Sequence, residues 1–192
     1  MATRTRPEPL SADQREIVRE AARYADTWVE LRARTQRIPG VQVAVAVAGE
    51  VLLSSAHGFA RLPGTNGKDD AGEPLTTAHL FRIASHSKTF TATAVMQLVE
   101  AGKLRLDDTV EELMPGRIRE GQRIRLRHLL GHTSGIPEYM RLDPWATAVA
   151  RNPRAVIPAR RLVSSAAAAP LNFEPGRTPT YSNTNHLMIT EK

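Results

Sequence analysis

The sequence predicts an α+β fold, and three observations carry that prediction. A helical pattern fills the first part of the chain, two apolar strand-like runs follow at residues 41–59, and helical periodicity returns from about residue 85. Helices and strands therefore occupy separate stretches instead of alternating, which is typical of α+β domains. With 192 residues, the chain is expected to form a single domain, with two small domains as the alternative.

The first predicted element is an amphipathic helix that ends near Arg37. Ser11-Ala12-Asp13-Gln14 has the spacing of a capping box, in which the serine and glutamine side chains satisfy backbone N–H groups at a helix start. Ile38-Pro39-Gly40 stops the helix, because proline cannot continue it. Apolar side chains recur at helical spacing behind the box, at Ile17, Ala21, Tyr24, Ala25, Trp28 and Leu31.

Two strands are expected next. Valines alternate with mostly small residues at 41–48, so neither face is strongly polar and a strand covered on both faces fits best. Gly49-Glu50 supplies a turn, and residues 51–59 return as the hairpin partner. Turn-forming residues at 61–76 predict a loop. A two-stranded hairpin is only marginally stable, yet no later segment is convincing as a third strand.

Residues 78–180 are expected to be mainly helical. A helix begins at about Ser85, and residues 145–169 favour two short helices divided by Pro153 and Pro158. The apolar face of the helix that follows Ser85 consists of Phe90, Ala94, Val95, Leu98 and Val99.

Composition and charge narrow the possible functions. The chain has no cysteine, which excludes disulfides, thiolate metal sites and a cysteine nucleophile. The N-terminus has basic residues without an apolar run behind them, so we expect no secretory signal, no membrane span and a cytoplasmic location. The net charge of +6 raises the possibility of nucleic-acid binding. The basic residues are spread out, and their one dense stretch, residues 117–127, lacks interleaved aromatics, so we expect solvated surface and no nucleic acid.

Ser85 and Lys88 are the first candidates for catalysis. A nucleophilic serine needs a base, and lysine can serve if burial or another cation lowers its pKa. Three residues apart at a helix start, both side chains lie on one face, beside backbone N–H groups that favour developing negative charge. The alternative is a serine N-cap beside an exposed lysine. The scarcity of lysine, with only Lys68, Lys103 and Lys192 besides Lys88, favours the catalytic interpretation.

A second candidate is Tyr181-Ser182-Asn183. On an extended or turn segment, residues two apart point the same way, so the phenol and the amide would share a face. The Tyr181 phenol could act as an acid or base if a nearby ammonium lowered its pKa from about 10. The Asn183 amide could hold a substrate carbonyl or the lysine. The alternative is a packed tyrosine beside an asparagine helix cap.

The histidines predict no metal site. His128 and His132 are four apart, as zinc ligands on a helix would be, but Leu129 stands where the metalloprotease pattern needs glutamate. His132-Thr133-Ser134-Gly135 is better interpreted as a turn than as a serine–histidine pair. We find no Gly-rich phosphate loop, so neither a metal nor another cofactor is expected.

These motifs, in this order, resemble the serine β-lactamase and D-alanyl-D-alanine carboxypeptidase superfamily, in its class C-like branch with esterase relatives. Residues 81–92 are similar to its nucleophile motif, and residues 104–115 to the connector that follows. Residues 129–136 look like its His-Thr-Ser-Gly turn, although threonine is more usual where Gly131 stands. Residues 173–183 look like its second catalytic motif. The resemblance runs from about Pro39 to Asn185 and implies a β-lactamase/transpeptidase-like fold.

The resemblance also implies a reaction and roles for four residues. Ser85 would attack a carbonyl and form an acyl-enzyme with a small amide or ester substrate: a β-lactam, a D-Ala-D-Ala peptide or a small ester. Lys88 and Tyr181 would share the proton transfer, with the identity of the base left open, and Asn183 would orient the substrate amide. The oligomeric state stays open.

The chain also departs from the family pattern. The family's third motif, Lys or His followed by Thr or Ser and Gly on a later strand, does not follow Asn183, and the strands and helix that should come next are absent. We therefore expect one incomplete domain over residues 1–192, with a helix and hairpin at 1–60 and a mainly helical part at 78–180. Such a chain should have weak or no hydrolase activity. The alternative is a non-catalytic remnant or binding module of the same fold.

Overall fold

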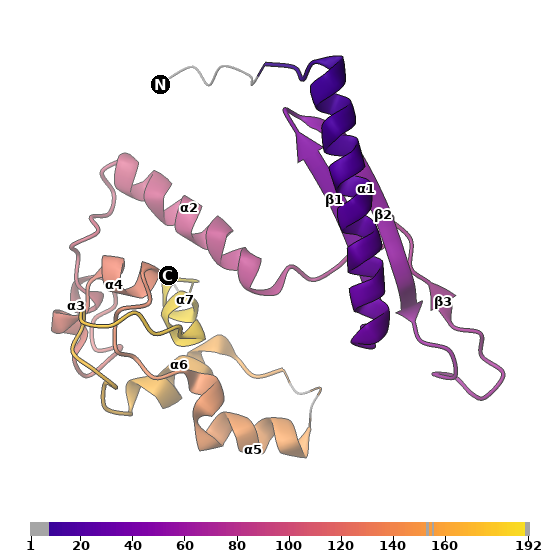
Figure 1. Ribbon diagram of the computed structural model, residues 1–192. Coiled ribbons are helices and arrows are strands. Elements are labelled where there is room, and N and C mark those ends of the chain that lie inside the picture. The colour runs from indigo at the N-terminus through magenta and orange to yellow at the C-terminus, as the bar shows by residue number, and fades with distance from the viewer. Residues whose placement is uncertain (1–7, 153, 155, 191–192) are drawn as a thin grey trace. The chain divides into compact units, whose positions relative to one another are not determined.

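The computed structural model describes residues 8–152, 154 and 156–190 (Figure 1). The chain divides into two compact units, Met1–Arg82 and Ile83–Lys192, each with its own internal packing. Two earlier expectations, the absence of a signal segment at the start of the chain and a helix break at Pro153, fall on residues outside the described part. Within the described part, no helix combines the length and apolar character needed to cross a bilayer.

Helix α1, Ala12–Thr35, confirms the predicted first helix. Its capping box is formed: the Ser11 hydroxyl accepts a hydrogen bond from the Gln14 N–H at 3.1 Å, and the Gln14 side chain accepts one from the Ser11 N–H at 2.9 Å. These bonds satisfy donors that a helix start otherwise leaves unpaired. The helix ends at Thr35, before Pro39. Arg37, between them, has a φ of 55°.

Strands β1, Gly40–Val47, and β2, Glu50–Arg61, form the predicted antiparallel hairpin. Ala48 and Gly49 have φ angles of 51° and 83°, the pair of positive values that a tight two-residue hairpin turn requires. A third strand, β3, Glu73–Pro74, pairs with the end of β2 and gives the order β1-β2-β3. The expectation of a loop throughout residues 61–76 was therefore wrong at Arg61, which ends β2, and at Glu73 and Pro74, where the chain folds back along β2.

Helix α1 packs on the sheet through small and polar residues. Ala22 and Ala33 are buried, and Asp26 accepts a hydrogen bond from the Ser55 hydroxyl at 2.5 Å and contacts the His57 ring nitrogen at 2.8 Å. The expectation that residues 41–48 are covered on both faces was wrong, since the strand alternates between half-buried and exposed positions. The large apolar side chains of α1 are exposed, namely Ile17, Tyr24, Trp28 and Leu31.

The unit Ile83–Lys192 is mainly helical, as predicted. Two of its helices match the pair expected at residues 145–169, with the first beginning slightly earlier. The α-helices are α2, Ser87–Glu100; α3, Val110–Leu113; α4, Leu126–Leu130; α5, Asp143–Arg151; α6, Ala159–Ala167; and α7, Asn183–Thr190. Short 3-10 turns occur at Ala84–His86, Gly121–Arg123 and Tyr139–Arg141.

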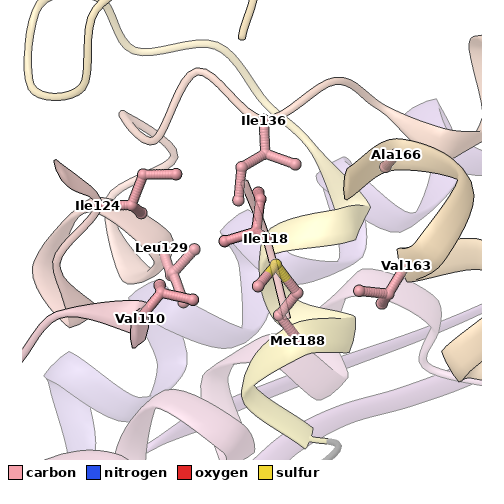
Figure 2. Packing of buried hydrophobic residues seen from close by; sticks show 8 residues of the cluster. All are labelled: Val110, Ile118, Ile124, Leu129, Ile136, Val163, Ala166 and Met188. Carbon is pink, nitrogen blue, oxygen red and sulfur yellow. The ribbon is translucent and has the colours of Figure 1, made fainter. Parts of the chain in front are cut away.

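Helix α7 lies at the centre of this unit, where α2, α4 and α6 all contact it (Figure 1). Its Met188 is fully buried and points into a cluster contributed by the surrounding segments (Figure 2). The other members of the cluster are Val110, Ile118, Ile124, Leu129, Ile136, Val163 and Ala166. This core fixes α7, and with it the chain immediately before α7.

Helix α2 buries less than its sequence pattern indicates. Of the apolar face expected there, only Val95 is buried, and Phe90 is 70% exposed. The periodicity located the helix correctly. It does not show which apolar side chains receive a packing partner, because that depends on the surrounding elements.

The core predicts a difference between two identical substitutions in this unit. Val163 has no exposed surface, whereas Val156 is 94% exposed. Val163→Ala should lower the free energy of unfolding by about 2 kcal/mol, since it removes buried methyl groups and leaves a cavity. Val156→Ala, the matched control, should change it by less than about 0.5 kcal/mol. Urea denaturation measures both, and equal losses would contradict the assigned core.

Candidate active site

Ser85 lies in the 3-10 turn Ala84–His86, which leads directly into α2. The nucleophile candidate therefore stands just before the α-helix and not within it, a small difference from the expected helix start. Ala84 has a φ of 45°, in the left-handed region that costs a non-glycine residue about 1–2 kcal/mol. Strain of this kind persists only where surrounding contacts fix the backbone, and it clusters at functional sites.

The structure brings together all four residues that the sequence singled out. The Ser85 hydroxyl lies 2.7 Å from the Tyr181 phenol oxygen, and the Lys88 ammonium donates to Ser85 Oγ at 3.2 Å. Lys88 also donates to Asn183 Oδ1 at 2.7 Å, and the Tyr181 phenol donates to the same oxygen at 3.1 Å. Residues about 95 positions apart in the chain thus form one continuous hydrogen-bonded group.

The Lys88 ammonium sets the electrostatics of this group. Hydrogen bonding from Lys88, followed by the hydrogen bond with Ser85, lowers the pKa of the Tyr181 phenol below its usual value. The ammonium also lies 5.0 Å from the centre of the Tyr181 ring. Ser85 and Tyr181 are exposed while Lys88 is half-buried, so the hydroxyl is open to a substrate and the charge is partly shielded.

A turn at residues 132–135 positions the second half of the site. The His132 carbonyl accepts from the Thr180 N–H at 2.8 Å, and the Thr133 carbonyl accepts from the Gly176 N–H at 2.8 Å. Gly135 has a φ of 80°, and a Cβ there would stand 2.2 Å from the Phe173 carbonyl oxygen. Only glycine fits this close approach.

Ser134 has a structural role in this turn. Its hydroxyl is buried, donates to Asn185 Oδ1 at 2.6 Å and accepts from the Ile136 N–H at 3.0 Å. These bonds occupy the hydroxyl, so the structure supports the turn interpretation over a Ser134–His132 pair. They also tie the turn directly to α7.

Two residues that touch the site were missed from the sequence. The Glu138 carboxylate accepts hydrogen bonds from the Asn183 N–H and, at 3.1 Å, from the Met140 N–H, which places a negative charge at the start of α7. His132 stacks on the Tyr181 ring, with 4.7 Å between ring centres. The turn motif around His132 is a signal that could have found it. Nothing local marks Glu138, which lies 45 residues from its partner.

His186 is a third missed residue, one turn into α7. It is buried, its ring lies 5.2 Å from that of His132, and its Nδ1 atom has no hydrogen-bond partner. Burial, the neighbouring His132 and the Lys88 ammonium lower its pKa to about 4. His186 is therefore neutral at pH 7. Among the described residues, no group of three or more His, Asp or Glu side chains is placed to hold a metal ion.

A family model described as Beta-lactamase matches residues 17–191. The chain belongs to the β-lactamase family. The predicted superfamily and fold are therefore confirmed, as part of the full-length fold.

The chain is similar to a penicillin-binding protein, an esterase and an amidohydrolase. A penicillin-binding protein 4 of Amycolatopsis lactamdurans is 39% identical over 126 residues, which cover 64% of this chain and 31% of that protein. The esterase EstB of Burkholderia gladioli is 35% identical over 116 residues, which cover 58% of this chain and 28% of the esterase. The crystal structure of a D-stereospecific amidohydrolase from Streptomyces sp. superposes with a TM-score of 0.66 at 29% identity, covering 79% and 42%.

The chain spans 31% or less of the length of these two curated relatives. Together the comparisons support a hydrolase of the β-lactamase family as the general kind of protein.

The buried His186 predicts a pH-dependent stability. Its folded-state pKa of about 4 lies below the usual 6.5, so the unfolded chain binds the proton first as the pH falls. Above pH 6.5 His186 is neutral in both the folded and the unfolded chain, so it does not lower the free energy of unfolding there. Between pH 6.5 and 4 the free energy of unfolding should fall by about 3 kcal/mol from this group.

Urea denaturation at a series of pH values measures this loss. His186→Leu should flatten the slope between pH 6.5 and 4, and His86→Leu, at an exposed histidine, is the matched control. If the slope in His186→Leu equals that of the unmodified chain, His186 is not its source.

Proposed function

We propose that this protein is a serine hydrolase that acts on amide or ester substrates through an acyl-enzyme. One observation carries the proposal: the Ser85 hydroxyl lies within hydrogen-bond distance of both the Lys88 ammonium and the Tyr181 phenol. A serine becomes an effective nucleophile when a positioned base takes its proton. The pair Lys88–Tyr181 supplies such a base, since each member touches the serine oxygen.

The reaction follows from this contact. As Ser85 Oγ bonds to the substrate carbonyl carbon, its proton passes to the Lys88–Tyr181 pair. The tetrahedral intermediate then collapses, the bond to the leaving nitrogen or oxygen breaks, and the pair returns the proton to the leaving group. Water attacks the resulting Ser85 ester in the same way, which releases the acid and restores the hydroxyl.

Tyr181 is the member of the pair better suited to act as the base. The Lys88 ammonium lowers the pKa of its phenol, so a larger fraction is ionised at neutral pH. Asn183 Oδ1 accepts a hydrogen bond from Lys88 and, while the phenol is protonated, one from Tyr181, which holds the two groups together. The Asn183 amide nitrogen points away from this pair and lies 3.6 Å from the Met140 sulfur. We assign to this nitrogen the role of orienting the substrate amide.

The substrate class rests on both site and relatives. A pocket of about 200 Å³ lies beside Lys88, lined by Ser87, Thr91, Asn183 and His186 among others. Neither Ser85 nor Tyr181 lines this pocket, so the choice of substrate rests on the chemistry of the serine and on the relatives. The relatives include a penicillin-binding protein, an esterase and a D-stereospecific amidohydrolase. We therefore propose a small amide or ester, with β-lactams, D-Ala-D-Ala peptides and simple esters as the candidates.

We further propose that residues 1–192 alone turn substrate over slowly. The backbone N–H of Ser85 would provide one oxyanion donor, and the sequence after Asn183 contains no Lys/His-Thr/Ser-Gly motif to provide the second. Losing one such donor costs about 100- to 1000-fold in rate. The alternative, a non-catalytic binding module, is favoured only if Ser85 proves unreactive.

Covalent labelling separates the two functions. A fluorophosphonate probe and a labelled penicillin should each modify Ser85, and Ser85→Ala should abolish the modification because the nucleophile is lost. Ser164→Ala on α6 is the matched control, since that hydroxyl donates to the Arg160 carbonyl outside the site. Mass spectrometry of the tryptic peptide identifies the modified residue. A folded chain that neither probe modifies would favour the binding module.

Turnover is a separate test. With nitrocefin and p-nitrophenyl acetate, the 192-residue chain should show hydrolysis at least about 100-fold below ordinary enzymatic rates, because the proposed site relies on the Ser85 N–H as its oxyanion donor without the family's third motif. Absorbance assays of the chain and of Ser85→Ala measure the serine-dependent part. Serine-dependent turnover at ordinary rates would contradict the proposal of slow activity.

A further inference from the structure

His132 contacts three consecutive residues of the Tyr181 segment. Its carbonyl oxygen accepts a hydrogen bond from the Thr180 N–H at 2.8 Å. Its ring nitrogen Nδ1 accepts one from the Ser182 N–H at 3.2 Å. Its ring stacks on that of Tyr181, with 4.7 Å between centres and 26° between planes. This one residue therefore holds the backbone on both sides of Tyr181 and stacks on its side chain.

Tyr181 needs such support because little packing surrounds its side chain. Its side chain is 52% exposed, so burial in a core does not select its rotamer. A different χ1 rotamer would move the phenol by several ångströms and break its 2.7 Å contact with Ser85 Oγ. The stacked imidazole covers one region of the ring and favours the rotamer that reaches Ser85.

The hydrogen bond to Ser182 also fixes the state of His132. A backbone N–H is always a donor, so the Nδ1 atom that accepts from it carries no proton, and a neutral ring has its proton on Nε2. Among the described residues, the charged or titratable groups that face this ring are Lys88, Glu138, His186 and the stacked Tyr181 itself. Burial, and then the Lys88 ammonium, lower the pKa of His132, which agrees with a neutral ring at pH 7.

The backbone of His132 is adapted to this role. Its φ of 55° lies in the left-handed region, which is uncommon for a residue other than glycine, although histidine is among the residues enriched there. The conformation allows its carbonyl and its ring to reach the same segment, residues 180–182. The cost of the backbone conformation is offset by these contacts.

We propose that His132 is a positioning residue that holds the Tyr181 phenol against Ser85 and Lys88. The effect of His132 on the reaction rate rests on the proposed function. Its effect on the position of the Tyr181 phenol does not. His132 itself takes no part in bond making. It restricts Tyr181 to the rotamer in which the phenol shares a hydrogen-bonded group with the nucleophile and the ammonium.

The ionisation of Tyr181 tests the geometry without requiring catalysis. Phenolate absorbance is titrated in the 192-residue chain and in Tyr181→Phe, and the difference isolates Tyr181 from Tyr24 and Tyr139. In folded His132→Ala, the pKa of Tyr181 should rise toward its usual value of about 10, because the phenol leaves Lys88. The same pKa in His132→Ala and in the unmodified chain would overturn the proposal.

Conservative variants separate positioning from a general loss of structure. His132→Asn keeps an acceptor for the Ser182 N–H and tolerates the left-handed backbone, so it should restore part of the lowered pKa of Tyr181. His128→Asn is the matched control, because His128 accepts from the Arg125 N–H and does not contact Tyr181. If His132→Ala does not fold, the pKa of Tyr181 is measured in His132→Asn and His132→Phe instead. An equal shift in His128→Asn, or no shift in both His132 variants, would overturn the proposal.

The rate of fluorophosphonate labelling gives the second readout. His132→Ala should slow labelling of Ser85 by about 10- to 100-fold, as expected when a catalytic group is displaced by about 1 Å. His132→Asn should recover part of the rate, and His128→Asn should label normally. If the unmodified chain is not labelled at all, the proposed function fails, but the titration of Tyr181 still decides the role of His132.

Discussion

The docking of the turn at residues 132–135 against residues 172–185 is the constraint on which the site depends. Carbonyl oxygens of the turn accept N–H groups of Asn172, Gly176 and Thr180, and the buried Ser134 hydroxyl reaches Asn185 in α7. Backbone hydrogen bonds of this kind fix register as well as distance. They hold the segment before α7 in one position, and only then can Tyr181 and Asn183 meet Ser85 and Lys88.

The first turns of α7 carry a group of buried polar side chains. Ser182 and Thr184 both donate to the Pro137 carbonyl, at 3.3 and 2.7 Å, and Asn185 pairs with Ser134. Buried polar groups destabilise a fold unless they are paired, and paired groups specify a single arrangement. His186, whose Nδ1 atom is unpaired, is an exception. The helix that supplies the site is thus held by specific hydrogen bonds on one side and by the Met188 core on the other.

Lys88 connects the chemistry of the site to this framework. Its ammonium reaches Ser85 and Asn183 directly, and its charge lowers the pKa values of Tyr181, His132 and His186. The two histidines are consequently neutral and the phenol is easier to ionise. One cation thus lowers all three pKa values, which disfavours charge on the imidazoles and favours it on the phenol. This suits the proposed proton transfer between serine, tyrosine and substrate. Membership of the β-lactamase family does not choose the substrate, because one fold serves several acyl-transfer reactions.

The sequence by itself located the local elements and singled out the four candidate site residues. The capping box at Ser11 located α1, alternating valines located β1, and Ser85, Lys88, Tyr181 and Asn183 stood in recognisable motifs. The helix and strand signals are local, so spacing and composition suffice to find them. The four candidate residues needed more than spacing: the order of the motifs and their resemblance to a known family singled them out. Only the tertiary structure decided which apolar side chains are buried, that β3 joins the sheet, and that Glu138, His132 and His186 surround the site. Those outcomes depend on contacts between residues far apart in the chain, and no periodicity encodes such contacts.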